Sequence, residues 1–86
     1  MISKTVVFNS DKMIPMKAVA LLIQKASAFR SSIWISRGER KANAKSLLGV
    51  MSLGIENKME VIITAEGSDE VEALEVVSEY LANPQG

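Results

Sequence analysis

The side chains available for nucleophilic or acid–base chemistry are hydroxyls, carboxylates, lysines and arginines, because the chain contains no histidine and no cysteine. A serine or cysteine nucleophile activated by a histidine base is therefore impossible. A zinc or other transition-metal site would have to be built from carboxylates alone, a poor ligand set for such metals. No nucleophile–base pair or phosphate-binding loop is recognisable either, so we expect no enzyme activity, no metal and no cofactor.

Ser46 is the hydroxyl with the most informative surroundings. The spacing of Leu47, Leu48 and Met51 predicts a short helix that starts from Ser46 and stops at Gly54. In one interpretation Ser46 only caps this helix, by accepting a hydrogen bond from a backbone N–H of the first turn. In the other it is also phosphorylated, because a phosphate at a helix N-terminus meets free N–H groups, and Lys45 and Lys41 could pair with it. The two interpretations are compatible.

The same short helix carries four large apolar residues, Leu47, Leu48, Val50 and Met51. So short a helix cannot bury all four on one face. We expect Leu47 and Val50 to lie in the core, and Leu48 and Met51 to form an exposed patch that docks partners. Lys17 is either an ordinary solvated residue or an electrostatic contact for an anionic partner.

Charge is unevenly distributed, although the formal net charge is zero. Residues 1–43 carry eight basic and two acidic residues, whereas residues 44–86 carry two basic and eight acidic residues. Either the folded halves neutralise each other, or a basic face remains that could receive an acidic partner or a phosphate. That face would comprise Lys12, Lys17, Arg40, Lys41 and Lys45. The overall neutrality argues against direct binding of nucleic acid.

These residues must be positioned by seven elements in the order β-α-β-β-α-β-α. Alternation predicts strands over 2–8, 32–37 and 59–66, with a hairpin that leads through 37–40 into 41–43. Helical spacing predicts helices over 15–28, from 46 and from 69. Three helices and a mainly antiparallel sheet indicate a two-layer α+β fold with the helices on one face, as a single domain over residues 1–86.

Particular residues are expected to fix these elements. The apolar stripe of the first helix would comprise Met16, Val19, Ala20, Leu22, Ile23, Ala26 and Ser27, and that of the last helix Val71, Leu74, Val77 and Leu81. Asp69 with Glu72 three residues later predicts a capping box at the start of the last helix. Trp34 lies on the strand face opposite Ile33 and Ile35, where we favour packing against the hairpin over an exposed interface.

No apolar run approaches the ~18 residues that a membrane-spanning helix needs. The N-terminal residues alternate like a strand and do not resemble a signal peptide. We therefore expect a cytoplasmic protein with no membrane partner. A monomer is expected, although the strand over residues 2–8 could exchange between two copies to form a dimer.

Three local strings, taken with the element order, resemble the HPr family, the small histidine-containing phosphocarriers of the bacterial sugar phosphotransferase system. The longest runs from Asn43 to Gly54 and resembles the regulatory serine segment of HPr proteins from Gram-positive bacteria. The others are residues 67–74, at the entry into the last helix, and residues 20–27 in the first helix. The resemblance covers nearly the whole chain. It implies an open-faced β-sandwich, in which three helices cover one side of a four-stranded sheet.

The chain departs from the family at the phosphorylated histidine. The family pattern there is roughly Gly-(Ile/Leu)-His-Ala-Arg-Pro, whereas residues 13–18 read Met-Ile-Pro-Met-Lys-Ala. Pro15 thus occupies the histidine position, and Lys17 replaces the arginine, keeping the charge but losing the bidentate fork. The chain is similar in this respect to the catabolite repression variant of HPr, which lacks the histidine and keeps the regulatory serine.

The resemblance implies a regulatory protein that cannot carry phosphohistidine. Ser46 would be phosphorylated by an enzyme like HPr kinase/phosphorylase, and the chain would then bind a catabolite-control transcription regulator. The expected partner-binding residues are Lys17, Lys45, Leu47, Leu48 and Met51. The alternative is a degenerate homologue that binds sugar-system or metabolic enzymes constitutively, without phosphorylation.

Overall fold

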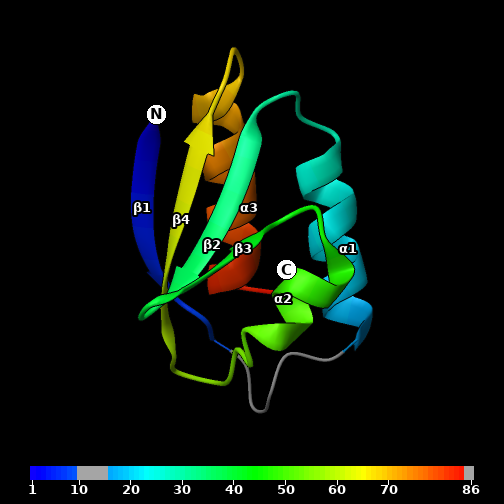
Figure 1. Cartoon of the computed structure of the whole chain (residues 1–86), viewed down its shortest axis with the longest axis vertical. Coiled ribbons are helices and arrows are strands. Elements are labelled where there is room, and N and C mark those ends of the chain that lie inside the picture. Colours follow the sequence, from blue (N-terminus) through cyan, green and yellow to red (C-terminus); the bar gives the residue numbers. More distant parts are fainter. Residues whose placement is uncertain (10–15, 85–86) are drawn as a thin grey trace.

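The computed structural model describes residues 1–9 and 16–84 of the chain. Its elements are β1 (Ile2–Val7), α1 (Met16–Ser27), β2 (Ser32–Arg37), β3 (Arg40–Asn43), α2 (Leu47–Ser52), β4 (Glu60–Glu66) and α3 (Glu70–Ala82). The strands form one antiparallel sheet in the order β1-β4-β2-β3 (Figure 1). The predicted α+β class, the open-faced sandwich and the order of elements are confirmed.

β4 lies between β1 and β2, and its alternating sequence explains why it can be central. Val61, Ile63 and Ala65 are almost completely buried beneath the helices. Ile62 points to the opposite face and remains 45% exposed. In an antiparallel sheet with one covered face, this alternation fixes the register, because a shift of one residue would turn the buried side chains out to solvent.

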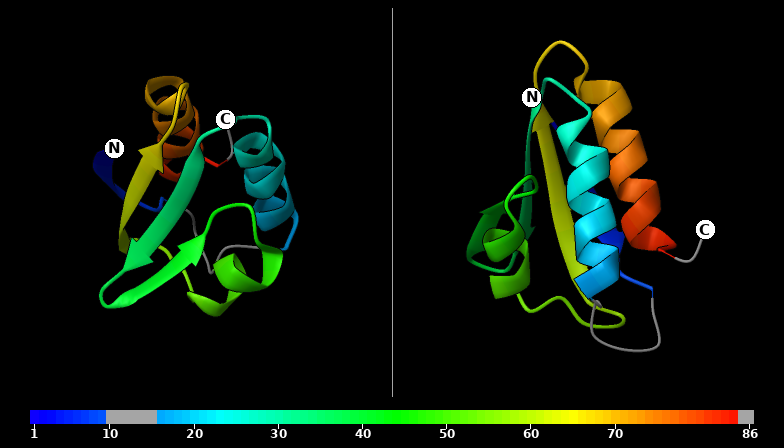
Figure 2. Two further views of the ribbon diagram at one scale, coloured as in Figure 1. Left: turned by 45° about the horizontal axis from the view of Figure 1, so that its top comes forward. Right: turned by 90° about the vertical axis from the view of Figure 1, so that its right-hand side faces the viewer.

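α1 and α3 lie side by side on the covered face, as the two views in Figure 2 show. α1 buries Ala18, Val19, Leu22 and Ala26, and α3 buries Ala73, Leu74, Val77, Ser78 and Leu81. The two helices are also linked by a hydrogen bond of 3.3 Å from the Tyr80 hydroxyl to the Ala18 carbonyl. The main core therefore fills the space between the sheet and this pair of helices.

The stripe predicted for α1 was partly wrong. Met16, Ala20 and Ser27 are exposed, because the side of α1 that faces the sheet is centred on Leu22. Pro15, expected in the first turn, lies outside the described residues. In α3, Leu74, Val77 and Leu81 are buried as predicted, but Val71 is 61% exposed because it lies on the outer side of the helix.

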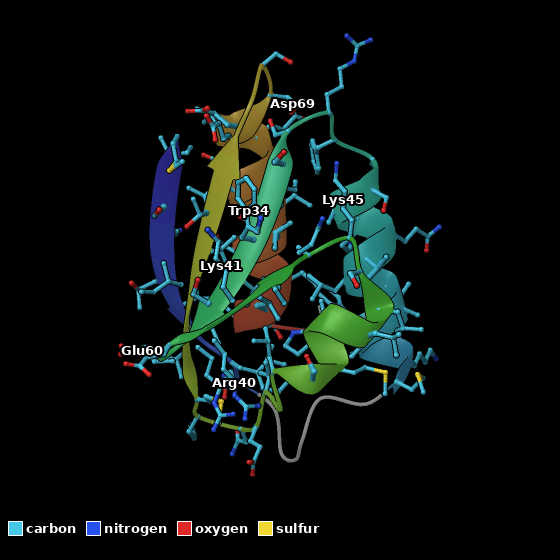
Figure 3. The ribbon with its side chains drawn as sticks, in the orientation of Figure 1. Trp34, Arg40, Lys41, Lys45, Glu60 and Asp69 are labelled. Atoms are coloured by element: carbon cyan, nitrogen blue, oxygen red, sulfur yellow. The ribbon has the colours of Figure 1, made fainter. Side chains whose placement is uncertain are left out.

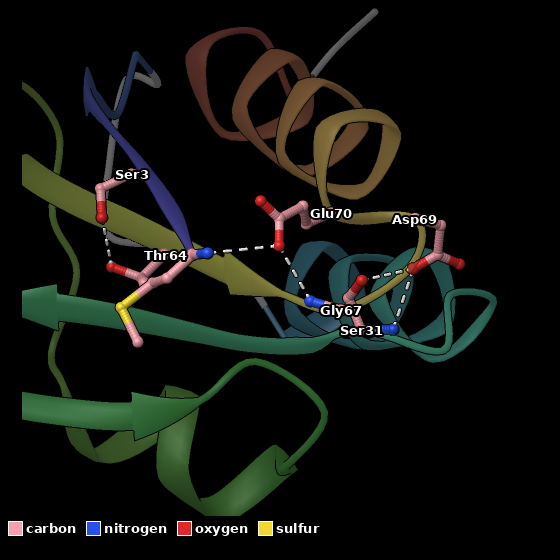
Figure 4. Close-up of polar contacts among 7 residues, drawn as sticks. Ser3, Ser31, Thr64, Gly67, Asp69 and Glu70 are labelled. Atoms are coloured by element: carbon pink, nitrogen blue, oxygen red, sulfur yellow. Dashed lines mark hydrogen bonds and ion pairs between the residues drawn. The ribbon is translucent and has the colours of Figure 1, made fainter.

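The turn before α3 differs from the predicted capping box. Asp69 makes no side-chain capping bond to its own helix. It accepts a hydrogen bond of 2.9 Å from the backbone N–H of Arg30. It also accepts one of 2.9 Å from the backbone N–H of Ser31 and another from the Ser31 hydroxyl (Figure 4). It is Glu70, not Glu72, that bonds back to the start of the turn, accepting from the Gly67 N–H at 3.1 Å. Asp69 therefore ties the turn after α1 to the start of α3.

The close approach of these two turns requires glycine at position 67. Gly67 has a φ of 153°, and a Cβ atom there would lie 2.6 Å from the Ser31 Oγ and 2.7 Å from the Ser31 Cα. Any side chain would push the backbone of Ser31 away. The contacts of Asp69 and the absence of a side chain at Gly67 thus act together to hold the two turns in contact.

Of the two possibilities for the uneven charge, the described residues do not show neutralisation through ion pairs between lysine or arginine and acidic side chains. Within residues 1–9 and 16–84, the observed ion pair joins the amino group of Met1 to Glu70 at 3.4 Å, and no lysine or arginine side chain pairs with an acidic one. The long cations contact backbone carbonyls and aromatic rings instead. In the described residues, these cations are therefore held by backbone carbonyls and aromatic rings and not by acidic side chains.

The first prediction concerns Asp69, whose hydrogen bonds from the Ser31 hydroxyl and the Arg30 N–H lower its pKa from 3.8 to about 2. A carboxylate with a lowered pKa stabilises the fold above its unfolded-state pKa, and this contribution is lost as the pH falls from about 3.8 towards 2. Asp69→Asn should therefore lower the free energy of unfolding at pH 7, and its difference from the parent should shrink across that window. Urea denaturation at several pH values measures both effects.

Glu72→Gln is the matched control, because Glu72 is an exposed acid on the same helix. It should change stability little at any pH. Equal losses for the two variants, or a loss for Asp69→Asn that persists unchanged at pH 2, would contradict the anchoring role of Asp69.

Candidate functional site

A tight turn after β3 places Ser46 at the start of α2. Ala44 is completely buried, and its N–H donates to the Ile33 carbonyl at 2.8 Å. Asn43 closes the turn twice: its side-chain oxygen accepts from the Lys45 N–H at 2.8 Å, and its carbonyl accepts from the Ser46 N–H at 3.0 Å. Ser46 is thereby fixed by backbone contacts before α2 begins.

Ser46 is the N-cap of α2, as predicted. Its backbone is extended, with φ −108° and ψ 117°, and its Oγ accepts a hydrogen bond of 3.1 Å from the Gly49 N–H. Its side chain is half-buried at the surface. Gly49 allows this geometry, because a Cβ there would lie 3.2 Å from the Ser46 Oγ and 3.3 Å from the Ala42 Cβ. The first turn of α2 thus packs closely on β3.

Two arginines from the β2–β3 hairpin hold the other end of α2. The Arg37 guanidinium donates to the Leu53 carbonyl at 2.7 Å, and that of Arg40 donates to the Ser52 carbonyl at 3.1 Å. Both cations lie at the negative end of the helix dipole, where positive charge is favourable. From the sequence, Arg40 was expected only to contribute to a basic face. The two arginines on either side of the hairpin turn were the available signal, but the sequence could not show that they contact the end of α2.

The outer side of α2 is apolar and exposed. Val50 is completely buried, as expected, whereas Leu48 is 79% and Met51 43% exposed. Leu47, expected in the core, is 43% exposed, because α2 packs on β3 through Gly49 and Val50 and turns Leu47 outwards. Met16, at the start of α1, is 59% exposed. Because α1 and α2 contact each other, we group the exposed apolar side chains Met16, Leu47, Leu48 and Met51 under one name, the α1–α2 apolar surface.

The lysines near Ser46 in sequence are engaged elsewhere. The Lys45 ammonium donates to the Phe29 carbonyl at 2.8 Å, just beyond the end of α1. The Lys41 ammonium lies 4.9 Å from the centre of the Trp34 ring, on the open face of the sheet (Figure 3). Trp34 thus packs against the hairpin, as favoured. Either lysine would have to leave its present contact to pair with a phosphate on Ser46.

The remaining site residues are placed as follows. Lys17 is an exposed residue in the first turn of α1. Lys12 and Pro15 lie outside the described residues. Across the described part of the chain, no three acidic residues lie close enough together to hold a metal ion. No helix within that part is long and apolar enough to cross a membrane.

Known proteins match this sequence and fold over most of the chain. A family model described as the PTS HPr component phosphorylation site matches residues 2–83. The HPr-like protein Crh of Bacillus subtilis is 40% identical over 65 residues, 76% of each chain. The phosphocarrier protein HPr of Bacillus anthracis has a TM-score of 0.89 at 36% identity, covering 93% of this chain and 95% of its own. A crystal structure of Bacillus subtilis Crh, described as a swapped dimer, has a TM-score of 0.76 at 34% identity, covering 94% and 93%.

The second prediction tests the cap. Ser46→Ala removes the acceptor for the Gly49 N–H and should lower the free energy of unfolding by about 1 kcal/mol, the usual cost of losing a serine N-cap. Ser52→Ala is the matched control at the other end of α2, where the exposed Ser52 hydroxyl donates to the Gly49 carbonyl at 2.8 Å. It should change stability by less than about 0.5 kcal/mol. Chemical denaturation measures the free energy of unfolding of both variants. Equal losses of stability would show that Ser46 has no special capping role.

Proposed function

The chain belongs to the HPr family, and we propose that within it the chain acts as a cytoplasmic regulatory protein that is phosphorylated on Ser46 and carries no phosphohistidine. Family members are phosphocarriers or regulators and not catalytic enzymes. The observation that carries the proposal is a serine N-cap beside an exposed apolar surface, in a chain without histidine.

The position of Ser46 suits a phosphoserine. A phosphate there would carry close to two negative charges, which the free N–H groups and the positive dipole end of α2 would attract. α2 contains no acidic residue, so no carboxylate of that helix would repel the phosphate. The modification should therefore leave the fold intact and act mainly through what the surface can bind. We propose that an enzyme like HPr kinase/phosphorylase adds the phosphate.

The α1–α2 apolar surface supplies the proposed docking face for a catabolite-control transcription regulator. Leu47, Leu48 and Met51 would bury apolar area against the partner. Lys17 and Lys45, together with the new dianion, would determine which charges the partner must present. A dianion beside this surface would favour a partner that offers arginine or lysine and would repel an acidic one.

The alternative is a constitutive binder of sugar-system or metabolic enzymes, which would use the same surface without phosphorylation. The exposure of Leu48, which needs no modification, is the observation that favours it. The two proposals differ in whether phosphorylation of Ser46 controls binding.

We propose that the chain is a monomer able to form a dimer by exchange of β1, an edge strand paired with β4 alone. Its relative Crh forms a swapped dimer in the crystal.

The third prediction concerns phosphohistidine chemistry. The general sugar-system enzyme with labelled phosphoenolpyruvate should leave the chain unlabelled, because proline at position 15 has no ring nitrogen that can accept and release a phosphoryl group. Pro15→His should not restore transfer, because Lys17 and Ala18 replace the arginine and proline of the family pattern. The Bacillus anthracis HPr serves as the positive control. An acid-labile label on the parent chain would contradict the proposal.

The fourth prediction concerns the serine. Incubation with an HPr kinase and ATP should place one phosphate on Ser46, identified by peptide mass spectrometry, and Ser46→Ala should abolish it. Ser52 is the internal control, because it lies at the C-terminal end of α2, where the dipole disfavours a phosphate. Modification of Ser52, or of neither serine, would leave the constitutive binder as the better account.

A further inference from the structure

Sulfur is present in this chain only as methionine, with five methionines and no cysteine. Two of the described methionines, Met16 and Met51, belong to the α1–α2 apolar surface, where they are 59% and 43% exposed. Neither is part of the buried core or of the partly buried residues packed against it. Half of the residues in the proposed docking surface are thus oxidisable thioethers open to solvent.

We propose that Met16 and Met51 form a reversible oxidation site, and that their conversion to methionine sulfoxide closes the α1–α2 apolar surface to the kinase that modifies Ser46. The inference rests on the proposed function, because it takes docking on that surface as its premise. It adds a second chemical input, which would control the access of the kinase to Ser46.

The reaction is a two-electron oxygen transfer from a peroxide. The thioether sulfur attacks one oxygen of hydrogen peroxide, the O–O bond breaks, and a sulfur–oxygen bond forms. The sulfur is oxidised to the sulfoxide, while the peroxide is reduced and released as water. A methionine sulfoxide reductase reverses the change, with thiols supplying the two electrons.

Oxidation should affect docking more than folding. A sulfoxide is polar and accepts hydrogen bonds, so burying it against an apolar partner carries a desolvation cost that the thioether does not have. The fold should persist because both side chains already face water. No new charge appears, so the bond from the Gly49 N–H to the Ser46 Oγ should be unaffected. Oxidation would therefore hinder the approach of the kinase to Ser46 without altering the cap itself.

Met59 provides a matched contrast within the chain. It is half-buried in the segment before β4, where its carbonyl accepts from the Phe8 N–H at 2.9 Å and its N–H donates to the Glu56 carbonyl at 3.1 Å. It does not belong to the α1–α2 apolar surface. A polar change at this position should therefore leave docking on that surface unaltered.

The experiment combines peroxide treatment with substitutions that need no oxidant. The folded chain is treated with hydrogen peroxide, the peroxide is removed, and peptide mass spectrometry measures the rate of oxidation at each methionine. HPr kinase then phosphorylates Ser46 at limiting chain concentration, so that the rate reports docking. In parallel, a Met16→Gln/Met51→Gln variant imitates the polar state, Met16→Leu/Met51→Leu keeps the surface apolar, and Met59→Gln is the control.

Met16 and Met51 should oxidise faster than Met59, and the oxidised chain should be phosphorylated at least about tenfold more slowly, a factor that corresponds to ~1.4 kcal/mol. The Gln double variant should be equally slow. The Leu double variant should keep the parent rate after peroxide, and Met59→Gln should match the parent. Circular dichroism should show an unchanged fold throughout.

Three outcomes would overturn the inference. The first is oxidation of Met59 as fast as that of the exposed pair. The second is phosphorylation of the Gln double variant at the parent rate, and the third is loss of phosphorylation rate by the Leu double variant on peroxide treatment. Absence of any Ser46 phosphorylation in the untreated parent would be a different result, because it contradicts the proposed function itself and removes the premise of this inference with it.

Discussion

A helix of six residues cannot maintain its own shape in water, so α2 depends on contacts made from outside it. Those contacts are divided between its two ends and its inner side. Ser46 caps the first turn, Arg37 and Arg40 hold the last carbonyls, and Val50 is inserted into the core. Because these contacts suffice to hold α2, its remaining apolar side chains are left free at the surface.

The same arrangement explains how a chain of this family can be a regulator without its histidine. Phosphohistidine transfer requires an imidazole that accepts and releases the phosphoryl group. A regulatory phosphoserine requires only a reachable hydroxyl and N–H groups that tolerate a dianion, and the start of α2 offers both. The scaffold that presents Ser46 is held by contacts elsewhere, such as Asp69 with the turn after α1 and Lys45 with the Phe29 carbonyl. None of these contacts involves the altered residues 13–18.

The sequence predicted most reliably what depends on local pattern. The alternation of Met59–Glu66 identified β4, and the position of Ser46 before an apolar run identified the N-cap. Two errors arise from contacts between distant segments. The Asp69 carboxylate does not cap α3, because it accepts hydrogen bonds from the backbone N–H groups of Arg30 and Ser31 instead. Leu47 faced solvent because α2 rests on β3 through Gly49. The contacts of the cations were left open by the sequence, because they depend on a fold that brings helix ends within reach of Arg37 and Lys45.

The central claim is that Ser46 chemistry controls what the α1–α2 apolar surface binds. Isothermal titration of a catabolite-control regulator with the chain, before and after phosphorylation by HPr kinase, tests it most directly. The proposal predicts that the phosphorylated chain binds at least about tenfold more tightly, and that Leu48→Ala weakens this binding without preventing phosphorylation. Equal affinity for the two forms, or tighter binding by the unmodified chain, would contradict it.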